Sequence, residues 1–290
     1  MKRFTVLMIA AVLAQIAVPE GQRDTPALAD LLRGAGVYAE RFERDFALIV
    51  GEEHYVQQVR PVPIGSRPTL RRTIVSDILF MWPSENSLLV TARSFRTVDD
   101  MPVADSASRL DRLLASATAD SAEKERLLRD ESARFNVGSV IRNFGDPTLV
   151  LQFLHQRLQS RFLFRLAGQE NVAGVPTWKL SYMERKSPTL IAVNDRNALA
   201  SGDVWIAVAN NALVRARLRL TDNTVDARVE MTYSPDAGWD VWVPRTMTER
   251  YELRVPYPGG RSGGIEEDIF STATYSNFRR FETSGRLVSP

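Results

Sequence analysis

Residues 213–233 read LVRARLRLTDNTVDARVEMTY, and this stretch decides the fold class. Apolar and polar side chains alternate through residues 214–220 and again through 225–233, which is the two-residue period of a strand with one buried face. Between the two runs, Asp222-Asn223 tolerates the left-handed backbone of a tight turn. The stretch therefore predicts a β-hairpin in an antiparallel sheet that is exposed to solvent on one face.

A two-residue turn at Asp222-Asn223 also sets the register of this hairpin. The expected cross-strand pairs are Leu220 with Val225, Arg219 with Asp226, Leu218 with Ala227, and Arg215 with Glu230. Each pair of opposite charges stabilises a sheet by roughly 0.2–1 kcal/mol. Arg217 opposite Arg228 is a mild conflict that solvent can screen. Apolar side chains meet at every inward position, which supports this register.

Further strand-like segments flank the hairpin on both sides. They are rich in β-branched and aromatic residues, and clusters of Pro, Gly and Ser separate several of them. The predicted strands are Ile49–Val59, Thr69–Trp82, Ser87–Val98, Ser160–Leu166, Thr177–Tyr182, Gly202–Val208, Trp239–Leu253 and Ile265–Phe281. Between Met247 and Leu253, Glu249 is the polar exception on an apolar face.

Residues 28–46 are predicted to form an amphipathic helix. One apolar stripe at helical spacing comprises Leu28, Leu31, Leu32, Ala35, Ala39, Phe42 and Phe46. Gly34 and Gly36 lower the helix propensity in the middle, where a break would occur first. The charges of the segment are of mixed sign, which favours a helix laid on a sheet over one lying on a membrane surface.

Asp105–Leu158 is predicted to be a helical excursion inserted in the sheet. Asp105–Ala117 and Ser121–Phe135 are rich in Ala, Leu, Arg and Glu. Asp120 with Glu123 resembles the capping pair of a helix start.

A third helix is predicted to begin at Asp146-Pro147, where a capping residue precedes a proline at the first helical position. Its apolar stripe comprises Val150, Leu151, Leu154 and Leu158. His155 falls late in this helix, where a positive charge is favourable and needs no functional explanation.

The first eighteen residues have the pattern of a secretory signal. Lys2 and Arg3 precede a mostly apolar run, residues 5–18, which Gln15 alone interrupts. The run is too short to cross a bilayer, which needs about 20 apolar residues. A buried N-terminal core helix is the alternative.

We expect residues 1–25 to be a signal peptide, with cleavage sites that fit at more than one position. Residues 26–290 are then a single curved-sheet domain with the helical insertion at about 105–158. The mature protein is expected to be soluble, without a transmembrane segment, and periplasmic or extracellular. Its oligomeric state does not follow from the sequence.

Composition excludes several classes of protein. Hydrophobic residues make up 44% of the chain, which excludes general disorder. The chain contains no cysteine, which excludes disulfides, thiolate metal sites, cysteine nucleophiles and a lipid-modified cysteine. The 37 basic and 35 acidic residues nearly cancel, and Lys2 and Arg3 account for the excess. We therefore expect no nucleic-acid partner, because such binding needs a basic stripe.

The sequence gives little indication of catalysis or metal binding. His54 and His155 are the two histidines, too few for a three-histidine zinc site, and Glu52 with His54 reads as a surface pair. G-x-S-x-G occurs once, at Gly260–Gly264, between two predicted strands and not at a strand-to-helix turn, and S-x-x-K occurs once, at Ser121–Lys124. Gly259–Gly264 lacks the lysine of a phosphate loop and reads as a hairpin loop. We predict no catalytic residue, metal ligand or cofactor, and no enzymatic activity.

Aromatic residues are spread over many of the predicted strands. They include Phe80, Trp82, Phe162, Phe164, Trp178, Tyr182, Trp205, Trp239 and Trp242. If the sheet curves, some of them line its concave face. Helices pressed into that face would give a closed core. A face left partly open would hold an acyl chain or an apolar peptide segment.

The order of elements resembles the superfamily of periplasmic lipoprotein carriers, LolA/LolB-like, and related sensor domains that share an incomplete barrel. The local matches are Phe42–Tyr55, Gly202–Ile206 leading to Leu213–Arg215, and Tyr275–Arg279. The segments Glu52–Tyr55 and Tyr275–Phe281 are also similar to uncharacterised secreted bacterial proteins. Asp105–Leu158 is longer than the equivalent part of the compact carriers. The resemblance implies that acyl chains lie on the concave apolar face beneath helices.

We therefore expect an α+β fold, with a strongly curved antiparallel sheet (an incomplete barrel) and helices packed on its concave face. The expected function is non-catalytic binding of an apolar ligand, a lipid or a lipidated protein, in the cell envelope. The residues expected to line the ligand are Phe162, Phe164, Trp178, Tyr182, Val229 and Met231. The alternative is a structural or protein-interaction module with a closed core and no ligand.

Overall fold

The computed structural model describes residues 25–62, 68–82, 88–115, 121–139, 145–193, 196–222, 224–254 and 265–280. The predicted signal segment, Asp120, Asn223 and the Gly259–Gly264 loop lie outside these residues. The division into a signal peptide and one domain stays a prediction.

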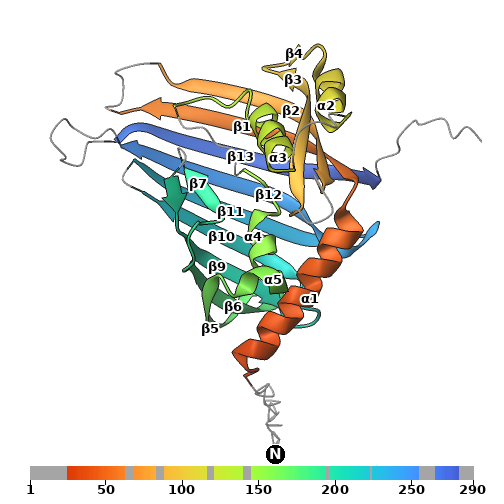
Figure 1. Cartoon of the computed structure of the whole chain (residues 1–290), viewed down its shortest axis with the longest axis vertical. Helices are drawn as coiled ribbons and strands as arrows, with labels where there is room; N and C mark the ends of the chain where they lie inside the picture. Colours follow the sequence, from red (N-terminus) through yellow and green to blue (C-terminus); the bar gives the residue numbers. More distant parts are fainter. Residues whose placement is uncertain are drawn as a thin grey trace, which may run out of the picture.

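An eleven-stranded antiparallel sheet dominates the described structure, and Figure 1 looks onto the face that carries α1, α4 and α5. The strand order is β4-β3-β2-β1-β13-β12-β11-β10-β9-β6-β5. The strands are β1 (Ile49–Pro61), β2 (Leu70–Met81), β3 (Val90–Val98), β4 (Met101–Pro102), β5 (Phe162–Val172), β6 (Val175–Glu184), β9 (Ala200–Ala207), β10 (Leu213–Thr221), β11 (Val225–Asp236), β12 (Trp239–Arg254) and β13 (Ile265–Arg280).

The remaining elements are a small hairpin and five helices. β7 (Ile191–Val193) and β8 (Arg196–Ala198) form a separate two-stranded sheet. The helices are α1 (Leu28–Phe46), α2 (Ser106–Ala115), α3 (Ser121–Ser132), α4 (Leu149–Phe153) and α5 (Gln156–Gln159). The predicted fold class is confirmed: β4 and β5 form the two ends of an unclosed antiparallel sheet, and helices cover its inner face. Each of the longer predicted strands is present, whereas the short β4, β7 and β8 were not predicted.

The predicted register of the β10–β11 hairpin is wrong by two residues. Leu220 lies opposite Ala227 and Thr221 opposite Asp226. The Asp222 carboxylate accepts hydrogen bonds from the N–H groups of Thr224 and Val225, both at 2.7 Å, so Asp222 opens the turn instead of occupying its centre. A shift of two residues leaves every side chain on its predicted face.

The shifted register changes the charge pairs across the same hairpin. Arg217 now lies opposite Glu230, with Nε donating to the carboxylate at 2.5 Å. The two arginines that face each other are Arg219 and Arg228, and both contact Asp226, at 2.8 and 3.2 Å. One carboxylate therefore relieves the like-charge pair.

α1 runs from Leu28 to Phe46 without the break that Gly34 and Gly36 allowed. Its apolar face is buried against the sheet, as predicted for a helix laid on a sheet. A Cβ at Gly36 would lie 2.8 Å from Cγ of Gln156, so the glycine permits close packing of α1 against α5. Tertiary packing thus outweighs the low helix propensity of glycine.

The predicted third helix is instead two short helices, α4 and α5. His155 has an extended backbone (φ −59°, ψ 133°), and its Nδ1 accepts the N–H of Arg157 at 3.4 Å. His155 therefore lies at the start of α5 and not late in a long helix, which corrects its predicted position. Val150, Leu151 and Leu154 of the predicted stripe are buried nevertheless.

The edge of strand β3 is covered by side chains from the helical excursion. The outward N–H groups of Thr91, Arg93 and Phe95 donate in turn to Asp146 Oδ2 (3.0 Å), Ser132 Oγ (3.2 Å) and Ser106 Oγ (2.6 Å). An unpaired edge strand is a site of aggregation, so side-chain acceptors here take the place of a neighbouring strand.

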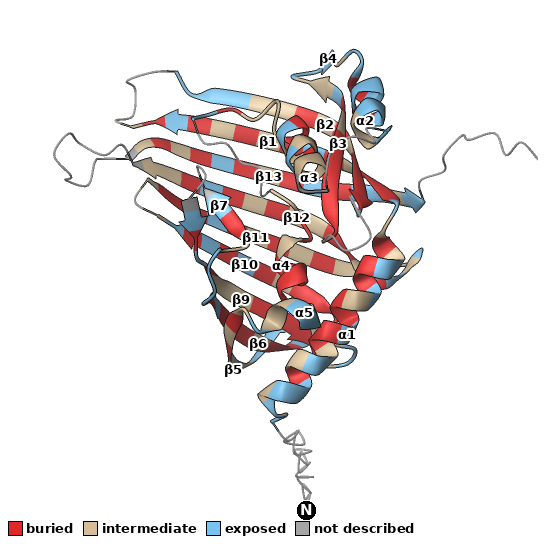
Figure 2. Ribbon diagram, viewed as in Figure 1, coloured by how far each residue is buried: buried red, intermediate tan, exposed pale blue. Residues whose placement is uncertain are grey.

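Apolar side chains form two clusters on opposite faces of the sheet. The main cluster fills the concave face beneath α1 and α4, and the buried bands of the strands in Figure 2 follow it. The second cluster joins Leu79 and Ala92 on the other face to Leu110 of α2 and Leu128 of α3. α2 and α3 therefore also reach the outer face at the β3 edge.

The buried tyrosines predict how stability depends on pH. Burial raises the pKa values of Tyr38, Tyr182, Tyr233 and Tyr275 above the usual 10.0. Because the unfolded chain ionises these phenols first, their contribution to stability is complete below about pH 10 and is lost as the pH rises further. We expect the free energy of unfolding in urea to fall steadily above about pH 10. Equal tyrosinate absorbance of native and urea-unfolded protein at about pH 10.5 would contradict this.

Candidate functional site

All six residues predicted to line a ligand are buried in the main apolar cluster. On β5 and β6 the ring centroids of Phe162 and Tyr182 lie 5.8 Å apart, and those of Phe162 and Phe164 5.9 Å apart. Trp178 lies on β6 as well. Val229 and Met231 lie on β11, with β10 and β9 between them and β6. The structure thus groups Phe162, Phe164 and Tyr182 and places the β11 pair in another part of the same floor.

Helix α4 covers this aromatic group with a residue that was not predicted. Phe153 stacks on Phe162 with centroids 4.7 Å apart, and meets Tyr182 edge-on at 5.7 Å. Residues 149–154 contain one polar side chain, Gln152, and such a run predicts a helix buried on all sides. That signal could have identified Phe153.

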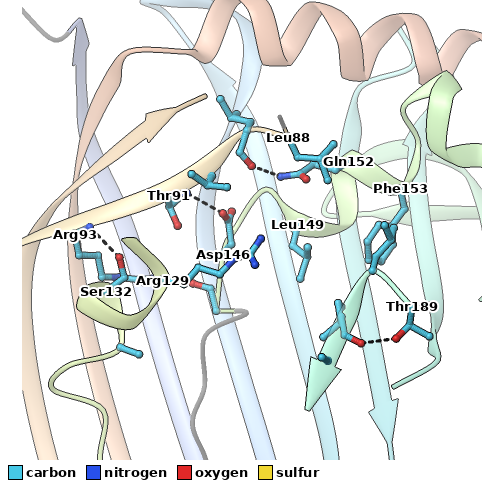
Figure 3. A pocket seen from close by; sticks show the side chains of 17 residues that line it. Leu88, Thr91, Arg93, Arg129, Ser132, Asp146, Leu149, Gln152, Phe153 and Thr189 are labelled. Atoms are coloured by element: carbon cyan, nitrogen blue, oxygen red, sulfur yellow. Dashed lines mark hydrogen bonds between the residues drawn. The ribbon is translucent and has the colours of Figure 1, made fainter. Parts of the chain in front are cut away.

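A cavity of about 210 Å³ lies beside α4, between β3, α3 and the β7 hairpin. Figure 3 shows polar side chains from β3 and α3 on one side of it and Leu149 and Phe153 on the other. The lining residues that matter below are Arg93, Arg129, Ser132, Leu149, Phe153 and Leu190. None of the six predicted residues lines this cavity, and Phe153 lies between it and the aromatic group of Phe162 and Tyr182.

The polar side of the cavity rests on a buried ion pair. Arg93 donates to the carboxylate of Glu53 through Nε at 2.5 Å and through a terminal nitrogen at 2.8 Å, and also to the carbonyl oxygen of Gly145 at 2.8 Å. Burial lowers the pKa of Arg93, but the charge and hydrogen bonds of Glu53 outweigh it and hold the pKa above its usual value. The ion pair joins β1 to β3, and the contact with Gly145 connects both strands to the residues that precede α4.

Further hydrogen bonds fix the α4 segment to β3. Asp146 accepts the N–H groups of Thr91 and Thr148, at 3.0 and 2.7 Å, and the Thr148 hydroxyl at 2.7 Å. The side-chain amide of Gln152 donates to the carbonyl oxygen of Leu89. These contacts place α4 over the sheet and leave the cavity beside it.

Glu249, the polar exception in the sequence, lies at the centre of the concave face and is 1% exposed. Its carboxylate accepts hydrogen bonds from the hydroxyls of Tyr55 and Tyr251, the latter at 2.7 Å. A Cβ at Gly145 would lie 2.9 Å from Glu249 Oε1, so a larger residue here would displace this carboxylate. The concave face of the sheet is therefore apolar at its β5–β6 end and polar at its centre.

The two histidines lie away from the cavity. His54 is exposed on β1, and Glu52 pairs with Arg96 at 2.8 Å. His155 lies between α1 and α5, 3.5 Å from Glu43, and burial with the charge of Arg157 lowers its pKa.

Neither a metal centre nor a membrane span is apparent in the described part of the chain. No group of three or more acidic or histidine side chains there is arranged to hold a metal ion. Each helix described is too short or too polar to cross a membrane.

No protein-family model matches the chain, and no curated protein is significantly similar to it. A protein described as an outer membrane lipoprotein-sorting domain, from Vibrio parahaemolyticus, has 11% identity and a TM-score of 0.41, covering 88% of this chain and 94% of that one. A LolA superfamily protein from Nitrosomonas europaea has 9% identity and a TM-score of 0.31, covering 92% and 99%. A DUF1329 family protein from Desulfovibrio piger has 15% identity and a TM-score of 0.33, and the match covers 87% of this chain and 98% of that one.

The resemblance to LolA-like proteins that the sequence predicted is found again among these solved structures.

Removing the Phe153 ring is expected to destabilise the fold strongly. Phe153→Ala leaves a void above Phe162 and Tyr182, and truncation of a buried Phe costs about 3–5 kcal/mol. The matched control is Phe270→Ala on β13, whose ring is 48% exposed. Urea denaturation should show the loss for the first variant and little change for the second. Equal midpoints would mean that α4 does not pack as described.

The buried ion pair is expected to respond differently to single and double substitution. Arg93→Met leaves Glu53 buried without its cation and should cost about 3–5 kcal/mol of stability. The double variant Glu53→Leu/Arg93→Met removes both charges and should recover part of that loss. Thermal unfolding of the wild type and the variants measures the coupling. Strictly additive losses would contradict a direct contact.

Proposed function

We propose that the protein binds an apolar ligand, such as an acyl chain of a lipid or of a lipidated protein, on the concave face of the sheet beneath α4. The observation that supports this most is the position of Phe153, which lines the cavity on one side and covers Phe162 and Tyr182 on the other. Movement of one side chain would join the cavity to the aromatic floor.

The size of the cavity supports a ligand that enters by displacing part of the roof. At about 210 Å³ it is smaller than typical ligand pockets of about 300–1,000 Å³. α4 has five residues and α5 four, and helices of that length are not stable alone. Their position depends on packing and on a few contacts, such as the Tyr233 hydroxyl donating to the Pro147 carbonyl. An acyl chain of matching shape can replace such packing.

The six residues predicted from the sequence remain the proposed path of a longer acyl chain. Phe162, Phe164 and Tyr182 would receive the segment nearest the cavity once Phe153 moves. Trp178, Val229 and Met231 continue the same buried surface toward the middle of the sheet. We further propose that this is binding without catalysis and that it takes place in the cell envelope, because residues 2–18 have the pattern of an export signal.

Ligand binding is tested by native mass spectrometry of protein purified from the cell envelope and by titration with a fluorescent acyl probe. Wild-type protein should carry a co-purifying lipid mass and bind the probe. Leu190→Trp, which places a large ring in the cavity, should weaken probe binding by about tenfold or more, as expected when roughly 1.4 kcal/mol of contact is lost. The matched control Leu199→Trp alters a residue that is 54% exposed and should bind as the wild type does.

A bare mass together with no probe binding by the wild type would overturn the proposal. That result would favour the second reading of the sequence, a structural or protein-interaction module with a closed core. Equal binding by both tryptophan variants would place the ligand elsewhere. Circular dichroism of each variant shows whether the fold is retained.

A further inference from the structure

We propose that the ligand of this site is an anionic amphiphile, an acyl chain that ends in a carboxylate or a phosphate, with Arg129 holding the anionic group. This inference rests on the proposed function and adds the chemical class of the ligand. The acyl chain would lie along Leu149, Leu190 and Phe153, and the anion would lie at the opposite wall.

The cavity is divided into a polar and an apolar side. Arg93 and Ser132 contribute to the polar side from β3 and α3, and Arg129 joins them from α3. The apolar side is built by α4 and by the segment that leads into β7, through Leu149, Phe153, Leu190 and Ile191. Figure 3 shows this separation. A molecule with a charged head and an apolar tail matches it at both ends.

Arg129 is the more accessible cation of this wall, because its side chain is 42% exposed whereas that of Arg93 is 9% exposed. Arg93 is neutralised by Glu53, which is fully buried, and also donates to Gly145. Arg129 contacts Glu125 one turn back on α3. Even so, burial lowers the pKa of Arg129, and the charges of Asp146 and Asp130 only partly offset the effect. A second anion beside its guanidinium would be stabilised.

The acidic group on the same wall is already committed to the backbone. Asp146 accepts three hydrogen bonds, from the N–H of Thr91 and from the N–H and hydroxyl of Thr148. Those bonds hold the β3 edge and the start of α4, so its oxygens are directed away from a ligand role. Ser132 Oγ accepts the N–H of Arg93, and its own proton can be donated to an anion. Arg129 and Ser132 together form a donor pair for a carboxylate or phosphate.

The test compares three ten-carbon probes that differ in the head: decanoate, decyl phosphate and 1-decanol. Calorimetric titration at low ionic strength should give an affinity for each anion about tenfold above that for the alcohol, as expected for one charge-assisted hydrogen bond. Arg129→Gln should remove most of that difference and leave the affinity for decanol unchanged. Arg129→Lys should retain part of it.

The matched control is Arg126→Gln, also on α3, where an exposed arginine pairs with Glu123 and Asp130. It should bind all three probes as the wild type does. The ratio of anion to alcohol affinity is taken within each variant, so a general loss of stability does not imitate the result. The two anions separate a carboxylate-headed ligand from a phosphate-headed one.

Equal affinity of the wild type for the anions and the alcohol would overturn this inference and leave the proposed function standing. An unchanged ratio in Arg129→Gln would overturn the role of Arg129. Failure of the wild type to bind any of the three probes would overturn the proposed function itself.

Discussion

An unclosed sheet with one apolar face is stable only when that face is covered and its edge strands are satisfied. Here the excursion between β3 and β5 covers the β3 edge and shares the cover of the apolar face with α1. Its serine and aspartate side chains accept the outward N–H groups of β3, and α4 packs Phe153 onto the aromatic floor. The position of the cavity follows from this arrangement, because it lies where the cover of the edge and the cover of the face meet.

Polar groups buried at the centre of the concave face connect the covering segment before α4 to the sheet. Glu53 with Arg93 and Glu249 with its two tyrosines are satisfied internally, and Arg93 and Glu249 both lie next to Gly145. A buried charge without a partner is strongly unfavourable, so these contacts specify where the chain crosses the strands. They also make the centre of the concave face more polar than its β5–β6 end.

Local sequence signals predicted most of the sheet and α1, because burial of one face repeats with period two in strands and 3.6 in helices. They failed where a side chain binds the backbone next to it. Asp222 accepts backbone N–H groups at the hairpin turn, which lies away from its expected position, and His155 does the same between the two short helices α4 and α5. The cavity could not be predicted, since its walls come from segments far apart in the sequence. The apolar run at residues 149–154 predicts burial of Phe153 but not its contact with Phe162. The burial of the six predicted lining residues follows from the alternation of side chains along their strands. Their access to a ligand depends instead on which segments of the chain cover them.

The pairing of β1 with β13 has a consequence for how the chain reaches its final form. β1 lies between β2 and β13, so Tyr55 faces Ile74 on one side and Ala273 on the other. The second neighbour is more than two hundred positions downstream. Until the last strand has been synthesised, one side of β1 has no partner from β13, and the ordering of that middle strand must wait for the far end of the polypeptide. Such non-local closure makes assembly slow and leaves partly made chains dependent on protection from self-association.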